Sequence, residues 1–107
     1  MQIQINTDSH ITSDEPFRTY VTDHLRDRLA RFALHLTRIE VHLADENAGR
    51  AGPDDKRCTL EARMEHRPPL AVHCHAESVH QALTGACDTL LRALDRTVSK
   101  LQTQHQH

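Results

Sequence analysis

Three consecutive stretches of the chain alternate apolar and polar residues, and this pattern most constrains the fold. Apolar side chains occupy every second position within residues 38–44, 57–65 and 70–76. Because successive side chains of a strand point to opposite faces, each stretch predicts a strand with one buried face and one wet face. The sequence Arg-Pro-Pro at 67–69 separates the last two, since proline cannot donate to a sheet ladder. We therefore expect an antiparallel meander.

Two stretches with the period of a helix flank these strands. Residues 14–36 include Pro16, which is tolerated only in a first helical turn, and residues 78–102 begin with a Ser-x-x-Gln capping box. In both stretches apolar residues recur at three- and four-residue spacing, which predicts an amphipathic helix. They are Phe17, Val21, Leu25, Leu29, Phe32 and Leu36 in the first helix, and Leu83, Leu90, Leu94, Val98 and Leu101 in the second.

The order of these elements defines a fold class. Residues 2–6 also alternate and predict a first strand, so the order is β-α-β-β-β-α. The helix between the first two strands implies a parallel pairing through a right-handed crossover. The apolar faces predict an α+β fold in which two helices pack on one face of a four-stranded mixed sheet. We expect one domain over residues 1–107, with a loop at 45–55 and a frayed tail at 103–107.

Composition excludes several classes of protein. The net charge is −2, so any binding of nucleic acid must come from charges clustered on one surface. No apolar run approaches the length of a membrane span and no secretory signal is recognisable, so we expect a cytoplasmic protein without a membrane partner. Cys58, Cys74 and Cys87 are odd in number and form no CxxC pair, so we expect reduced thiols.

Basic side chains recur along both predicted helices. Arg92, Arg96 and Lys100 step by four along the second helix and form a ridge beside its apolar stripe. If the helices pack side by side, the two rows line one surface that can bind a phosphate backbone. The alternative is a solvated helix face whose cations are neutralised by acidic residues four positions away, and spacing alone favours it. The row of the first helix comprises Tyr20, His24, Arg28, Arg31, His35 and Arg38.

Histidine and cysteine suggest two other kinds of site. His73 and His75 point to one face of a strand and His42 lies on a neighbouring strand, so three imidazoles are candidates for zinc or copper. The alternative, a polar open sheet face, is favoured because no cysteine shares that face and no HExxH motif is present. The three cysteines occupy core positions, where a thiol behaves as a small hydrophobe. No phosphate loop or nucleophile elbow is present, so we expect no enzyme, no cofactor and no small-molecule substrate.

Two short patterns on the helices identify a family. The first is Ile11-Thr12 followed by Phe17-Arg18-x-x-Val21-x-Asp23, and the second is Ala82-Leu83 followed by Leu90-x-Arg92-x-Leu94-x-Arg96. Together with the element order, they resemble the short-form ribosome hibernation-promoting factors, the family that includes ribosome-associated inhibitor A and was once called sigma-54 modulation protein. The resemblance covers nearly the whole chain.

This resemblance implies a fold similar to a double-stranded-RNA-binding domain and a function in translation. Members of the family dock in the decoding region of the small (30S) ribosomal subunit and silence translation in stationary phase or stress, as binding proteins without turnover. Basic helix residues contact 16S rRNA, and Arg92 and Arg96 match that pattern most directly. A drifted member that binds another protein through its open sheet face is the alternative. The expected rRNA-binding residues are Arg92, Arg96, Lys100, Arg28, Arg31 and Arg18.

Overall fold

The computed structural model describes residues 1–47, 52 and 55–105, and its elements follow the expected order. Residues 48–51 and 53–54 of the expected loop, and 106–107 of the expected tail, lie outside the described residues. The elements are β1 (Gln2–Thr7), α1 (Glu15–Arg28), the 3-10 turn η1 (Ala30–Phe32), β2 (Arg38–Asp45), β3 (Lys56–Arg63), β4 (Leu70–Ala76) and α2 (Val79–His105).

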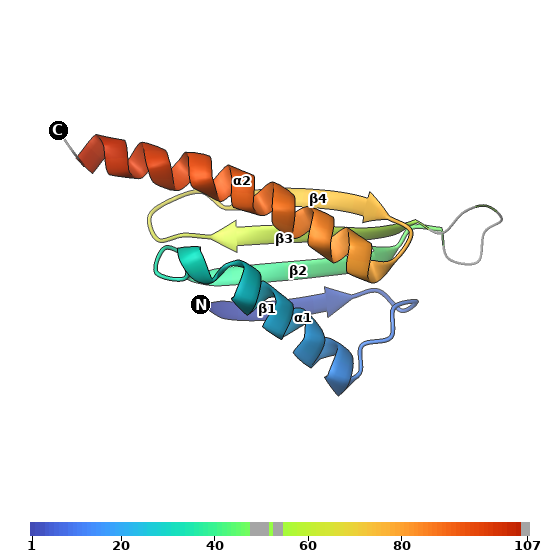
Figure 1. The fold of residues 1–107 in the computed structure, drawn as a ribbon. Coiled ribbons are helices and arrows are strands. Elements are labelled where there is room, and N and C mark those ends of the chain that lie inside the picture. The colour runs from blue at the N-terminus through green and yellow to red at the C-terminus, as the bar shows by residue number, and fades with distance from the viewer. Residues whose placement is uncertain (48–51, 53–54, 106–107) are drawn as a thin grey trace.

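The four strands form one mixed sheet in the order β1-β2-β3-β4. β1 pairs with β2 in parallel, and β2, β3 and β4 form the expected antiparallel meander. Both helices lie on the same face of the sheet, α1 over β1 and β2 and α2 over β3 and β4 (Figure 1). The expected α+β architecture is confirmed.

The core lies between this sheet and the two helices. The strands place Ile39, Val41 and Leu60 at 0% exposure on the helix side, where α1 adds Val21 and Leu25. α2 adds its expected stripe of Leu83, Leu90, Leu94 and Val98, whereas the side chain of Leu101 lies outside the described part. Burial of these aliphatic faces is the main contribution to the stability of the fold. None of the described helices is long and apolar enough to span a membrane.

The first helix is shorter than the predicted 14–36. Asp14 caps its start by accepting the Phe17 N–H at 2.9 Å, but the α-helix ends at Arg28 and the chain continues through η1. Phe32 and Leu36 nevertheless remain buried, at 4% and 3% exposure. The apolar spacing continues through this tighter turn, which leads the chain toward β2. The periodicity therefore predicted the buried residues correctly, but the prediction that the α-helix extends to residue 36 was wrong.

The second helix starts as predicted and extends further. Ser78 accepts the Gln81 N–H at 3.1 Å, and the helix continues through His105, three residues beyond the predicted end at 102. Gly85 allows α2 to lie close to β4, because a side-chain carbon there would come within 2.4 Å of Cys74 Sγ. Such a contact would be a clash.

Candidate nucleic-acid interface

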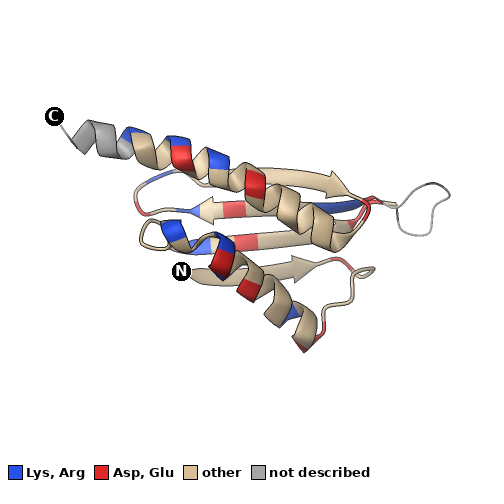
Figure 2. Ribbon diagram, in the orientation of Figure 1, with Lys and Arg blue, Asp and Glu red and all other residues tan. Residues whose placement is uncertain are grey.

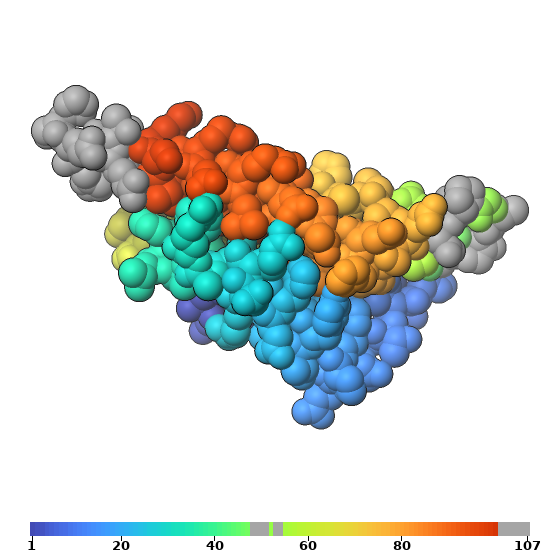
Figure 3. Space-filling view, viewed as in Figure 1, coloured from blue at the N-terminus to red at the C-terminus, as the bar shows by residue number. Residues whose placement is uncertain are grey.

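The two helices meet along a seam on the outer face of the molecule, where Figure 3 shows α1 and α2 in contact. Two cations of the first helical segment pair with acids of α2 across this seam. Arg28 binds Asp88, and Arg31 Nη2 lies 2.7 Å from Asp95 Oδ1. The predicted side-by-side packing is therefore present, but Arg28 and Arg31 are neutralised by the neighbouring helix.

Arg92, Arg96 and Lys100 form a separate row, which we call the α2 row. All three side chains are exposed. Each four-residue step turns about 40° around the helix, so the row moves progressively away from the α1 side, where Asp88 and Asp95 lie. Arg92 Nη2 donates to Thr89 Oγ1 at 3.5 Å, and within the described chain no member of the row forms an ion pair with an acid. Figure 2 shows basic and acidic segments alternating along α2.

Arg18 lies apart from the other predicted rRNA-binding residues. Its guanidinium donates to Ser13 Oγ at 3.0 Å and approaches the Ile5 carbonyl oxygen at 3.5 Å, so it covers the free edge of β1. Ten residues separate Arg18 from Arg28, which corresponds to about 80° around an α-helix. The structure therefore brings Arg28 and Arg31 to the seam and the α2 row to the outer side of α2, whereas Arg18 lies on the side of α1 that faces the edge of the sheet.

A cluster of three rings at one end of the seam was not predicted as a unit. Tyr20, His24 and His80 have ring centroids 5.9 to 6.1 Å apart, and the Tyr20 hydroxyl is hydrogen-bonded to His80 Nδ1. The sequence placed Tyr20 and His24 on one face of the first helix, but His80 lies sixty positions after Tyr20. Nothing in the local pattern shows that these rings meet.

Burial favours the uncharged forms of two rings of this cluster, His24 and Tyr20. Desolvation lowers the pKa of His24, and the nearby Arg28 and His80 lower that pKa further. His24 Nε2 is buried and has no hydrogen-bond partner among the described atoms. Desolvation also raises the pKa of the Tyr20 phenol, with a smaller contribution from Cys87. Both shifts favour the uncharged forms of His24 and Tyr20, which lie beside the cations of the seam.

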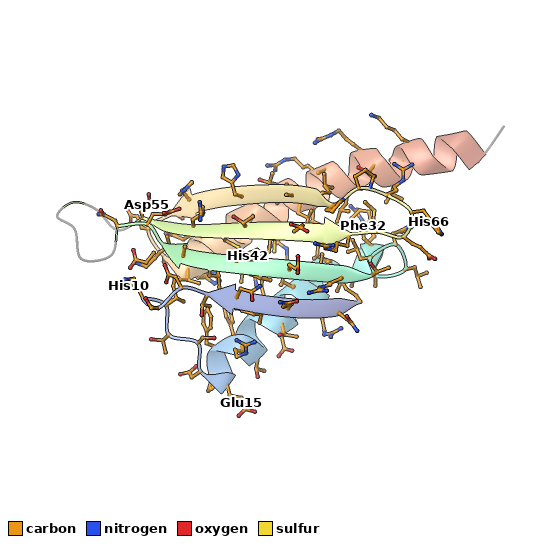
Figure 4. The ribbon with its side chains drawn as sticks, turned by 180° about the vertical axis from the view of Figure 1, so that it is seen from behind. His10, Glu15, Phe32, His42, Asp55 and His66 are labelled. Atoms are coloured by element: carbon orange, nitrogen blue, oxygen red, sulfur yellow. The ribbon has the colours of Figure 1, made fainter. Side chains whose placement is uncertain are left out.

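The open face of the sheet is polar and internally paired (Figure 4). Glu40 accepts from Arg38 at 2.9 Å and lies 3.3 Å from Arg63, which also pairs with Glu61 at 2.7 Å. These pairs neutralise most of the charge on this face. They leave little net potential there for attracting a polyanion.

The histidines of this face do not form a three-ligand metal site. His73 and His75 have ring centroids 5.7 Å apart, but Thr59 lies between His73 and His42 in the strand register. Two strand spacings separate His42 from His73 by roughly 10 Å. No group of three His, Cys, Asp or Glu side chains in the described ranges is placed to hold a metal ion.

Two of the three cysteines lie in the core, as predicted, whereas Cys74 is only partly buried and packs against the core. Cys58 and Cys87 are fully buried, and burial raises the pKa of Cys58 to about 12 and that of Cys87 to about 11. A thiol with such a pKa is protonated at neutral pH and is a poor nucleophile. These residues act as packing groups.

Comparisons with known proteins agree with this architecture. A ribosomal subunit interface protein from Coxiella burnetii is similar with a TM-score of 0.72 at 10% identity, over 92% of this chain and 99% of that one. The N-terminal domain of Protein Y from Thermus thermophilus is similar with a TM-score of 0.71 at 21% identity, over 91% of this chain and 99% of that one. Among curated proteins, none matches this sequence.

The family assignment follows from the sequence model rather than from these structures. At such low identities the two structures show the fold alone. The family model described as Sigma 54 modulation protein / S30EA ribosomal protein, in contrast, matches residues 3–102, which is nearly the whole chain. The chain therefore belongs to the sigma-54 modulation protein / S30EA ribosomal protein family.

Proposed function

We propose that this protein silences translation by binding 16S rRNA in the decoding region of the small (30S) ribosomal subunit. The observation that carries the proposal is the α2 row, three exposed cations that no acid of the described chain neutralises. Cations presented along one helix bind a phosphate backbone and release its counterions. The family to which the chain belongs indicates that this phosphate backbone is that of ribosomal RNA. The proposed activity is that of a cytoplasmic binding protein without turnover, used in stationary phase or stress.

The other predicted residues take smaller parts in this proposal. Arg31 and its partner Asp95 are both well exposed, at 64% and 59%, so Arg31 can also reach a phosphate. Arg28 is less exposed and must share its charge with Asp88. Arg18 faces the edge of β1 and contacts rRNA only where the rRNA also wraps around α1. We therefore rank Arg92, Arg96 and Lys100 above Arg28 and Arg31, and these above Arg18.

Co-sedimentation with 30S subunits over a range of salt concentrations tests the proposal. We expect wild-type protein to bind at low salt and to dissociate steeply as salt rises. Arg92→Gln with Arg96→Gln removes two phosphate contacts, so the slope of log K against log salt should fall by about 2. Wild-type protein that fails to co-sediment even at low salt would contradict the proposal.

A control variant with the same change in charge separates a contact from a general electrostatic effect. Arg38→Gln with Arg63→Gln also removes two positive charges, but on the open sheet face. We expect this control to keep a salt slope close to that of wild type. Equal losses in both variants would show that the α2 row is not the contact surface. Binding of a non-ribosomal protein in place of the 30S subunit would favour a drifted member of the family.

A further inference from the structure

The Tyr20, His24 and His80 rings form an aromatic surface that has no part in the phosphate binding proposed above. Tyr20 is 38% exposed and is one of two large apolar side chains exposed in the described chain. Its hydroxyl is hydrogen-bonded to His80, and its ring lies against both histidines. Two contacts thus fix the tyrosine side chain, so little rotamer entropy remains to be lost when a ligand binds.

The ring cluster lies within reach of the cations of both the seam and the α2 row. One helical turn after His24, Arg28 lies at the seam with Asp88. His80 precedes Arg92 by twelve residues on α2, which is about 18 Å along the helix axis and about 120° around it. A few nucleotides of an extended strand cover this distance. The cluster and the α2 row can therefore contact one and the same single strand.

The chemical character of the cluster favours an aromatic ligand over an aliphatic one. Aromatic rings stack on the flat face of another π-system, and unpaired nucleobases stack on tyrosine and histidine in many RNA-binding proteins. An aliphatic partner would instead need a groove lined by apolar side chains. Here the rings are surrounded by charged and polar groups, among them Asp27, Arg28 and Asp88.

We propose that the Tyr20–His24–His80 cluster is a stacking site for one unstacked nucleobase of a single-stranded RNA segment, beside the backbone held by the α2 row. The inference rests on the proposed rRNA binding and adds a contact to a base where the α2 row contacts only phosphate. Tyr20 and His80 supply the outer rings, and His24 supports them from the buried side.

The chain carries its own reporter for this contact. Tyr20 is the only tyrosine and the sequence contains no tryptophan, so the intrinsic tyrosine fluorescence comes from Tyr20 alone. We expect a short single-stranded oligoadenylate to quench this fluorescence in step with its binding, which the anisotropy of a labelled oligonucleotide measures independently. An abasic oligomer of the same length has the same phosphates without bases. It should bind about 5- to 100-fold more weakly and should not quench.

Variants separate stacking from charge. His80→Ala keeps the reporter and every cation, and it should weaken binding of oligoadenylate while leaving binding of the abasic oligomer unchanged. Tyr20→Leu should do the same in the anisotropy measurement. Arg92→Gln with Arg96→Gln should weaken binding of both oligomers to the same extent.

Three outcomes would overturn the stacking site. One is equal affinity for the two oligomers, and another is binding of oligoadenylate without any change in fluorescence. Either result leaves the proposed 30S binding intact if wild-type protein still co-sediments with the subunit. The third is no binding of either oligomer at low salt, which contradicts the stacking site directly, while co-sedimentation decides the proposed function separately.

Discussion

The seam and the α2 row contain similar numbers of arginines, yet they differ in electrostatic character. At the seam, Arg28 and Arg31 face Asp88 and Asp95 of α2. In the α2 row, Arg92 and Arg96 point away from these acids and toward solvent. The arginines of the seam are therefore paired with acids, whereas those of the α2 row are available to bind a phosphate.

This difference shows that the availability of cations on a helix depends on how the neighbouring helix packs as much as on the helix's own residues. Asp88 and Asp95 are seven residues apart, or two turns of α2, so they share one face of that helix. That face packs beside α1. Arg92 and Arg96 lie within four residues of these acids, but their orientation leaves them unpaired.

The largest predicted effect is on binding to 30S subunits, when the acids of the seam are removed. Asp88→Asn with Asp95→Asn frees Arg28 and Arg31, so binding to 30S subunits should tighten by about tenfold and the salt slope should steepen by about 2. Co-sedimentation across salt concentrations measures both quantities. As a control, Asp23→Asn with Glu65→Gln makes the same change in net charge without freeing a seam arginine. An equal gain in both variants would show that only net charge matters.

The energetic coupling across the seam should be smaller. A double-mutant cycle of Arg28→Ala and Asp88→Ala should give a coupling of about 0.5–1 kcal/mol in the free energy of unfolding, because Arg28 is partly shielded from solvent. The same cycle for Arg31 and Asp95 should give less, since both side chains are mostly exposed. Denaturant unfolding at low salt measures both cycles. A larger coupling for the Arg31 pair would contradict this ranking.

The smallest predicted effect concerns protonation at the seam. The pKa of His24 is lowered in the folded state by burial and by Arg28, so the unfolded chain takes up the proton more readily. The free energy of unfolding should therefore fall as the pH drops from about 7.5 to about 5.5, and less so in His24→Gln. Denaturant unfolding at each pH provides the measurement. The exposed His35→Gln serves as control, and a pH dependence unchanged by His24→Gln would refute the assignment.

The strands were predictable because each shows one periodicity over its whole length. Ile39, Val41 and Leu60 were expected on the buried face, and they lie there at 0% exposure. The end of α1 was not predictable in the same way. Leu29, Phe32 and Leu36 keep an apolar spacing that a helix and a 3-10 turn satisfy equally, so burial alone does not reveal where the helix ends.

The exposure of the α2 row was predictable from spacing, whereas its contrast with the seam was not. Four-residue steps place Arg92, Arg96 and Lys100 beside the apolar stripe whatever the rest of the fold. The pairing of Arg28 with Asp88 joins residues sixty positions apart, and it depends on how the two helices lie on the sheet. The ring cluster depends on the same contact, because His80 comes from α2 and the other two rings from α1.

The length of α2 has a consequence for any site that receives this protein. The helix has 27 residues and β4 has seven, so the helix is about 40 Å long and the strand about 23 Å. The excess length lies at the C-terminal end, which projects past the sheet (Figure 1). The projecting part of α2 is a single helix, narrower than the sheet with its two helices. A groove too narrow for the whole domain can therefore still hold this part of the helix.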